Sequence, residues 1–308
     1  GNTLCDPAKP IKFPEIEFPA PCISMAVYAK KAGEEDKIFS GLARLMEEDP
    51  TITVTKDAET TESLISGLGE THIDVVAKKL QSKFGVECIL QDPKIPYRET
   101  IRKKIDVRGR HKKQSGGHGQ FGDVVIEFRP NDDPTNTDFI FEDAVVGGVV
   151  PRNFIPAVEK GLRDNIKKGV LAGFPVVGLT AKLHDGSYHP VDSSEMAFKI
   201  AGSMAFKDAA KKAGLMLLEP IMKVELNAPD ENTGDLIGDI TSRRGQIVTI
   251  DAGSNGSSRV QANIPLAELF GYATAIRSLS RGRATYSMEP AHFERVPKQI
   301  QDKIVEKK

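Results

Sequence analysis

The spacing of apolar residues over positions 17–92 predicts six elements in the order strand, helix, strand, strand, helix, strand. The second helix repeats apolar residues at three- and four-residue steps and is expected to end at Gly85. The same order recurs over residues 219–291, although the two segments share no visible sequence similarity. Because each element must bury an apolar face, a repeated order of six elements leaves few possible folds. The predicted strands are 23–28, 51–55, 63–66, 86–90, 220–226, 245–250, 259–264 and 284–288, and the predicted helices are 34–48, 70–84, 232–242 and 266–279.

The order βαββαβ is that of a ferredoxin-like sandwich, the split βαβ unit. We therefore expect an α+β protein in which two ferredoxin-like domains, 17–92 and 219–291, flank an unlike middle domain, 93–218. A short amphipathic helix is predicted within the tail 292–308, and linkers are expected near 93–96 and 217–220. The middle domain is predicted to hold the strands 103–110, 123–128, 138–141 and 174–183 and the helices 153–168 and 193–213.

Composition excludes several classes of protein. The 308 residues are 39% hydrophobic and 28% charged, and no apolar run is long enough to span a membrane. No signal peptide is recognised. Cys5, Cys22 and Cys88 are too few and too scattered for a disulfide framework or a zinc site, so we expect reduced thiols in a cytoplasmic protein. No Gly-Lys dipeptide occurs, so the chain contains no P-loop for nucleotide phosphates.

The net charge of −1 hides a cationic stretch, residues 98–113, in which eight Lys or Arg residues accompany Glu99 and Asp106. Such a stretch is either a solvated face or a contact for a phosphate-rich partner. It leads into a glycine-rich loop, which is either a plain hairpin connection or a close approach of the backbone to a phosphate or base. The loop and its cations consist of Lys112, Lys113, Gly116, Gly117, His118 and Gly119.

A second loop, residues 185–195, is predicted to expose His189 near its tip. Gly186 permits an unusual backbone turn, and Tyr188 and Pro190 restrict the chain on both sides of the histidine. The pattern therefore indicates a positioned side chain rather than a mobile linker.

The residues after His189 are expected to begin the long helix. Asp192 and Glu195 have the spacing of an N-terminal cap, which leaves His189 without a structural role. A hydrolase that uses His189 and Ser193 is disfavoured, because the members of a catalytic triad come from separate elements.

Arginines in the second ferredoxin-like copy form another group of candidates. Cations at a helix end can stabilise the helix dipole, and they can equally contact phosphates. Both alternatives stay open for Arg243, Arg244, Arg277, Arg281 and Arg283.

Several short motifs together resemble one family. The chain resembles the C-terminal three domains of bacterial elongation factor G, a translational GTPase, and the resemblance extends over nearly its whole length. It rests on residues 1–6 (GNTLCD), 65–70 (ISGLGE), 147–151 (GGVVP), 155–158 (IPAV), 188–189 with 191–195 (YH and VDSSE), 242–245 (SRRG) and 270–274 (FGYAT).

The resemblance implies that the chain is a fragment. Residues 1–16 would be the end of a preceding β-barrel domain, and GTP and Mg²⁺ would be bound in an N-terminal domain outside this chain, which would itself hold no cofactor, metal or catalytic residue. The flanking units would be domains III and V. The middle would be domain IV, a ribosomal-protein-like α/β domain with a left-handed βαβ crossover.

The resemblance also implies a ribosomal role for a monomer. The domain IV tip would enter the decoding site, where His189, Tyr188, Gly186, Lys112, Lys113 and the loop 116–119 would contact transfer RNA and messenger RNA. The five arginines of domain V would contact ribosomal RNA. The implied function is GTP-dependent translocation during polypeptide elongation.

Two alternatives accompany this reading. Pro190 stands where the family usually has an acidic residue, and Thr71-His72-Ile73 replaces the common Leu-His-Leu, which leaves open a paralogue specialised for ribosome recycling. A free-standing RNA- or ribosome-binding module without a GTPase domain is the other alternative.

Overall fold

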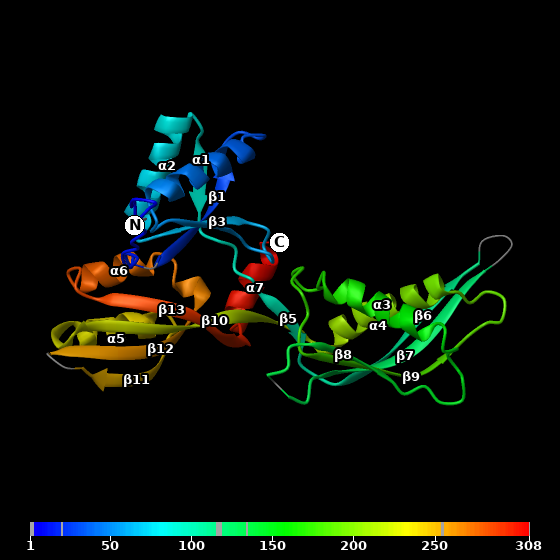
Figure 1. The fold of residues 1–308 in the computed structure, drawn as a ribbon. Coiled ribbons are helices and arrows are strands. Elements are labelled where there is room, and N and C mark those ends of the chain that lie inside the picture. The colour runs from blue at the N-terminus through cyan, green and yellow to red at the C-terminus, as the bar shows by residue number, and fades with distance from the viewer. Residues whose placement is uncertain (1–2, 20, 115–118, 134, 254–255, 308) are drawn as a thin grey trace. The chain divides into compact units, whose positions relative to one another are not determined.

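The computed structural model describes residues 3–19, 21–114, 119–133, 135–253 and 256–307 (Figure 1). Contacts divide the chain into two compact units. One comprises Gly1–Ile95 with Ile221–His292, and the other comprises Pro96–Pro220 with Phe293–Lys308. No helix within the described ranges is both long and apolar enough to cross a membrane.

The first βαββαβ copy forms a four-stranded antiparallel sheet in the order β2-β3-β1-β4, which confirms the ferredoxin-like prediction. Apolar residues at helical spacing on both helices, among them Leu42 and Ile73, are buried against this sheet. Gly85 ends the second helix in the left-handed conformation, as predicted. The elements are β1 (Ile23–Ala29), α1 (Glu35–Glu48), β2 (Thr53–Lys56), β3 (Ser63–Gly67), α2 (Glu70–Phe84) and β4 (Cys88–Gln91).

The second copy has the same topology, with the order β11-β12-β10-β13. The single helix predicted over 266–279 is wrong, because Gly271 takes a φ of 69° and separates a 3-10 turn, η1 (Leu266–Glu268), from α6. The boundary predicted near 217–220 agrees with the division between the two compact units at Pro220 and Ile221, but these residues form part of β10 rather than a linker. The other elements are β10 (Leu215–Pro229), α5 (Asp230–Ser242), β11 (Gln246–Ala252), β12 (Ser257–Pro265), α6 (Tyr272–Leu279) and β13 (Thr285–Arg295).

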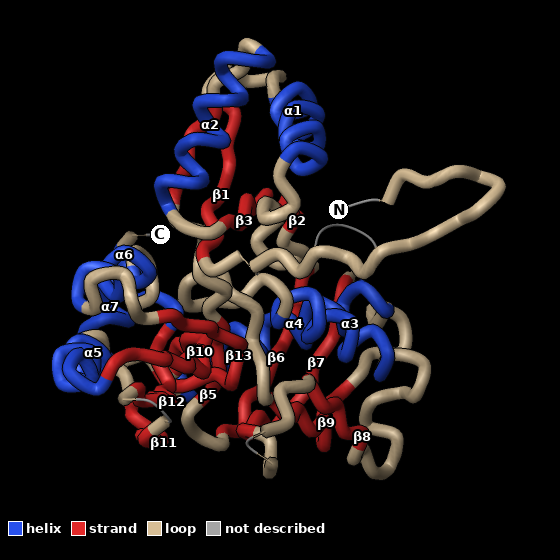
Figure 2. Tube along the Cα trace, turned by 60° about the vertical axis from the view of Figure 1, so that its left-hand side comes forward, coloured by secondary structure: helices blue, strands red, loops and turns tan. Residues whose placement is uncertain are grey.

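The middle domain contains a four-stranded sheet in the order β6-β7-β9-β8. Strands β8 and β9 are parallel neighbours joined through α3, so a βαβ crossover is present; its hand stays a prediction. Helices α3 and α4 lie together on one side of this sheet (Figures 1 and 2). The elements are β6 (Ile105–Lys113), β7 (Gln120–Pro130), β8 (Phe139–Asp143), α3 (Ile155–Ile166), β9 (Leu179–Ser187) and α4 (Glu195–Ala213). Helix α7 (Lys298–Glu306) confirms the predicted C-terminal helix.

Helix α4 lies directly against backbone at several glycines. A Cβ atom on Gly109 would lie 2.2 Å from the carbonyl oxygen of Ala201, and one on Gly122 would lie 2.6 Å from that of Ala197. The same holds between the two helices, where a Cβ on Gly161 would lie 2.2 Å from the Lys199 carbonyl oxygen. Glycine is therefore required for these approaches.

The strand predicted over 174–183 begins only at Leu179. The preceding residues turn around Glu99, whose buried carboxylate accepts hydrogen bonds of 2.8 to 3.1 Å from four backbone amides. Glu99 belongs to β5 (Arg98–Ile101), a short strand absent from the prediction, which pairs with Leu215–Leu218 of β10. The donors are the amides of Val170, Leu171, Ala172 and Phe174.

Candidate nucleic-acid interface

One end of the middle domain brings together the two loops that the sequence singled out. The amide of Phe121 donates to the carbonyl oxygen of Asp192 at 2.8 Å, and the Ser193 hydroxyl donates to the carbonyl oxygen of Phe121 at 2.9 Å. The amide of Gly119 donates to Asp192 Oδ1 at 3.0 Å. We call residues 119–121 and 187–194 the tip. Of the predicted loop residues, Gly116, Gly117 and His118 lie outside the described residues, so only Gly119 is placed beside the second loop.

His189 has a half-exposed side chain, as predicted. Its ring nitrogen Nδ1 accepts from the backbone amides of Val191 at 3.3 Å and Asp192 at 3.2 Å. Its own amide donates to Ser193 Oγ at 2.9 Å. The ring lies near Phe121, with 6.4 Å between ring centroids. Backbone and hydroxyl groups thus fix the histidine, while part of its ring stays accessible.

The predicted helix cap is wrong in its main residue. Ser194 is the N-cap of α4, and its hydroxyl accepts from the Ala197 amide at 3.2 Å. Asp192 lies outside the helix and binds Gly119 instead. Glu195 is the first helical residue, where a carboxylate favours the positive end of the helix dipole. Serine and aspartate are both good caps, so the sequence pattern alone does not separate them.

The role predicted for Gly186 is also different. Gly186 lies in β9 rather than in a turn, and a Cβ there would approach the carbonyl oxygen of Asp123 to 2.4 Å.

The Asp123 carboxyl on the neighbouring strand is buried. Burial would raise its pKa, but hydrogen bonds from Arg108 and Ser187 outweigh burial and hold that pKa below its usual range. Tyr188 follows with a half-exposed ring.

The cationic stretch contains two kinds of residue. Lys104 is paired with Glu127 and Arg108 with Asp123. Lys112 and Lys113 are exposed at the end of β6, and among the described residues neither has an ion pair. Arg110 lies over the Phe121 ring, 5.6 Å from its centroid, and the same ring lies near His189. Arg102 and Lys103, before the other end of β6, are also exposed and without an ion pair among the described residues, so accessible cations lie at both ends of this strand. Those at the tip end lie beside His189 and can meet an anionic partner there.

Among the described residues, four of the five candidate arginines of the C-terminal copy, all except Arg281, donate to acceptors within their own compact unit. Arg243 bonds to Asp239 and to the Glu268 carbonyl oxygen and stacks on Tyr272, and Arg244 bonds to Glu268 Oε1. Arg283 contacts Glu231 and Asn232. Arg277 donates to the Leu68 carbonyl oxygen at 2.7 Å, and Arg281 is exposed with a φ of 54°.

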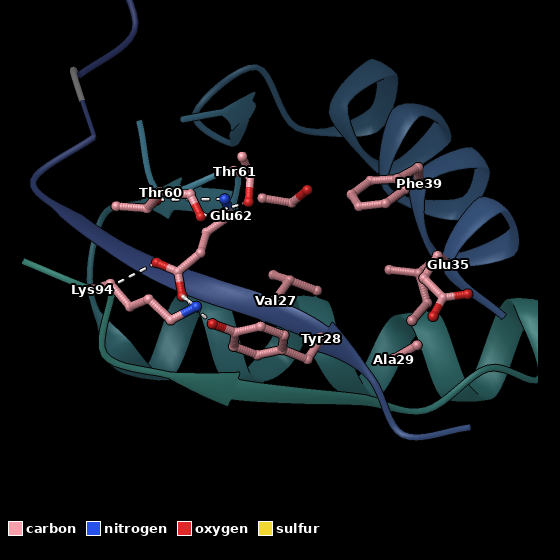
Figure 3. A pocket seen from close by; sticks show the side chains of 11 residues that line it. Val27, Tyr28, Ala29, Glu35, Phe39, Thr60, Thr61, Glu62 and Lys94 are labelled. Carbon is pink, nitrogen blue, oxygen red and sulfur yellow. Dashed lines mark hydrogen bonds and ion pairs between the residues drawn. The ribbon is translucent and has the colours of Figure 1, made fainter. Parts of the chain in front are cut away.

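A cavity of about 290 Å³ lies in the N-terminal βαββαβ copy (Figure 3). Glu62 and Lys94 are at one end and Phe39 at the other, with Val27 between them. The buried Glu62 carboxylate accepts from the Tyr28 hydroxyl and from the Lys94 amide at 2.8 Å, and the bond to Glu62 raises the pKa of Tyr28 to about 12. Because hydrogen bonds within the protein already satisfy the Glu62 carboxylate, we regard Glu62 as a structural residue. The sequence did not predict this cavity.

The described residues contain no group of three or more His, Cys, Asp or Glu side chains arranged to hold a metal ion. The tip holds a fixed, half-exposed histidine, and exposed cations lie beside it. Such groups can contact a polyanion through its backbone without catalysing a reaction.

Comparison with known families agrees with this architecture. Residues 18–92 match elongation factor G domain III, residues 93–214 match domain IV, and residues 216–304 match the elongation factor G C-terminus. The fold is also similar to that of a crystallised protein from Thermus thermophilus, with a TM-score of 0.81 and 40% sequence identity. The similarity covers 96% of this chain but 44% of that protein, so the chain spans less than half its length.

The chain has two ferredoxin-like units and, between them in sequence, an α/β domain with an accessible polar tip. The three family matches follow the same order along the chain, and together these features define a translation factor. The chain belongs to the elongation factor G family and contains its domains III and IV and its C-terminal domain.

Proposed function

We propose that this chain is the ribosome-binding part of a translational GTPase that promotes GTP-dependent translocation of transfer RNA and messenger RNA. The observation that carries the proposal is the tip, where His189 is fixed beside the base of the glycine-rich loop and next to accessible cations. Moving a short paired RNA requires contacts to backbone and minor groove that do not depend on base sequence. The exposed lysines beside the tip and the half-exposed His189 ring supply such contacts.

GTP hydrolysis is assigned to a separate domain of the full-length protein, because the 308 residues contain no P-loop. In the proposal, GTP and Mg²⁺ are bound there, and the present domains bind the ribosome in the cytoplasm. Arg243, Arg244, Arg277 and Arg283 would contact ribosomal RNA by exchanging their present acceptors for phosphates, and the exposed Arg281 would contact it directly.

The test replaces His189 with alanine in the full-length factor. We expect translocation to slow by about tenfold or more while ribosome-stimulated GTP hydrolysis is retained, since the lost contact lies far from any nucleotide site in sequence. Rapid-kinetic measurement of messenger RNA movement checks this. His184→Ala is the matched control, because His184 is on β9 of the same sheet and pairs with Asp106 at 2.8 Å.

An unchanged translocation rate in His189→Ala would contradict the proposed role of the tip. If ribosome splitting were impaired instead, the recycling paralogue would replace the translocase. Ribosome binding by a native protein lacking any GTPase domain would favour the free-standing module.

A further inference from the structure

The residues that follow His189 hold its ring in one hydrogen-bonding state. Nδ1 receives two backbone N–H groups, those of Val191 and Asp192, so it acts as an acceptor and carries no proton. In a neutral imidazole the proton then resides on Nε2. No acceptor for Nε2 is found among the described residues. The ring therefore retains one N–H donor for an external group.

Asp192 Oδ2 also lies 3.4 Å from Nδ1. An ion pair there would need a proton on Nδ1, which would exclude both amide bonds. The two amides are closer, at 3.2 and 3.3 Å, and their positions are fixed by the turn itself. We therefore favour the acceptor state of Nδ1.

Ser193 connects this turn to strand β7. Its hydroxyl accepts the His189 amide at 2.9 Å and donates to the Phe121 carbonyl oxygen at 2.9 Å. The hydroxyl thus serves as acceptor and donor in one chain of hydrogen bonds. Alanine would break both bonds, whereas threonine retains a hydroxyl in the same position.

Asp192 connects the same turn to the glycine-rich loop. Its carbonyl oxygen accepts the Phe121 amide at 2.8 Å, and its Oδ1 accepts the Gly119 amide at 3.0 Å. A Cβ on Gly119 would lie 2.9 Å from Asp192 Cγ, so the two segments are in direct contact. Asp192 therefore fixes Gly119, the last residue of the glycine-rich loop.

We propose that Asp192 and Ser193 are positioning residues that present His189 as an Nε2–H donor and join it to the glycine-rich loop. The group recognised by the histidine is then a hydrogen-bond acceptor, such as a phosphate, ribose or base oxygen of RNA. This inference rests on the proposed function for its ligand, and the positioning itself can be tested in the isolated chain.

The first experiment is nitrogen-15 NMR of the labelled chain at neutral pH. Two-bond correlations to the ring protons identify which ring nitrogen carries the proton. We expect Nε2–H as the single state of His189 in the unmodified chain and in Ser193→Thr, and a mixture in Ser193→Ala. A proton on Nδ1 in the unmodified chain, or the same single state in Ser193→Ala, overturns the inference.

The second experiment follows hydrogen exchange of the Gly119 amide. Loss of one hydrogen bond should accelerate its exchange roughly tenfold in Asp192→Ala. Asp192→Asn retains an acceptor oxygen and should remain close to the unmodified chain. Equal exchange in all three proteins overturns the role of Asp192, and a folded spectrum of each variant excludes general unfolding as the cause.

The third experiment separates this inference from the proposed function. In the full-length factor, Ser193→Ala should slow translocation about as much as His189→Ala, and Ser193→Thr should restore it. If His189→Ala slows translocation and Ser193→Ala does not, the positioning inference fails and the proposed function stands. If the NMR result holds but neither variant affects translocation, the proposed function fails and the positioning stands.

The salt dependence of ribosome binding tests the donor chemistry. A cation that neutralises a phosphate contributes about one unit to the slope of log affinity against log salt concentration, whereas a neutral donor contributes none. His189→Ala should therefore leave this slope unchanged, and Lys112→Ala should reduce it by about one. A reduced slope in His189→Ala would show that the ring binds as a cation and would overturn the proposal.

Discussion

The middle domain and the C-terminal ferredoxin-like unit use their carboxylates differently. In the middle domain, Glu99 and Asp123 are fully buried, and the carboxylate of Glu99 accepts from four backbone amides. In the C-terminal unit, Glu231 and Glu268 remain partly or largely exposed and bind arginines. The first arrangement fixes the chain path, whereas the second leaves arginines whose partners can be exchanged for phosphates at small cost.

This difference separates two ways of contacting RNA. The tip has its polar groups committed to holding its own backbone, so that the His189 ring and the neighbouring lysines need no rearrangement. In the C-terminal unit, Arg243, Arg244 and Arg283 must leave an internal acceptor before they bind a phosphate. We therefore expect mutations of the buried acids to affect folding and mutations of the arginine pairs to affect binding.

The largest effect is expected for Glu99→Gln. Glutamine has nearly the same shape but turns an NH₂ group toward two of the four amide donors, which leaves buried donors unsatisfied. We expect the free energy of unfolding to fall by about 3 kcal/mol. Urea unfolding measures it, with Glu142→Gln as control, because Glu142 forms a more exposed pair with Arg129 and should cost at most about 1 kcal/mol. Equal effects of the two variants would remove the contrast.

Asp123→Asn should have the next largest effect, about 2 kcal/mol, since Arg108 loses its charged partner but stays solvated. Because the pKa of Asp123 is lowered on folding, its contribution is complete above the unfolded value of about 3.9 and is lost as pH falls through the lower folded value. The difference in unfolding free energy between the two proteins should therefore shrink below about pH 4. Urea titrations at several pH values measure it, and a pH-independent difference would contradict the assignment.

The smallest effect on folding is expected for Arg283→Ala. Its pair with Glu231 is exposed, so the midpoint of thermal unfolding should not change measurably. The slope of ribosome affinity against salt should fall by about one if Arg283 exchanges Glu231 for a phosphate. Lys112→Ala should weaken binding more than Arg283→Ala at the same salt, because Lys112 has no internal partner to leave among the described residues. The reverse order would break the comparison.

The sequence predicted both ferredoxin-like units because apolar periodicity is a local signal that each strand and helix carries by itself. Strand β5 was missed for the opposite reason. It is short, and its pairing partner Leu215–Leu218 lies far away along the chain. The late start of β9 has the same origin, since Glu99 holds the segment before it. Both the pairing of β5 and the late start of β9 depend on residues far away in the sequence, so the local sequence pattern predicts neither.

The site shows a similar division. An exposed His189 and its proximity to the glycine-rich loop could be predicted, the second from the family resemblance and seen here at Gly119. The state of the histidine ring could not, because it depends on hydrogen-bond geometry within a turn. The sequence pattern predicted Asp192 as the helix cap, whereas the structure has Ser194 in that place, accepting from the Ala197 amide. Both residue types cap helices well, so only the fold decides between them.

The glycine contacts of helix α4 have a mechanical consequence. The helix begins shortly after the turn that holds His189 and runs for 19 residues, about 28 Å, with its backbone against β6, β7 and α3. Side chains that separate two elements can tilt and let them slide, but backbone in contact with backbone has no such layer to deform. We therefore expect a force applied at His189 to displace α4, β6, β7 and α3 together, with little deformation between them.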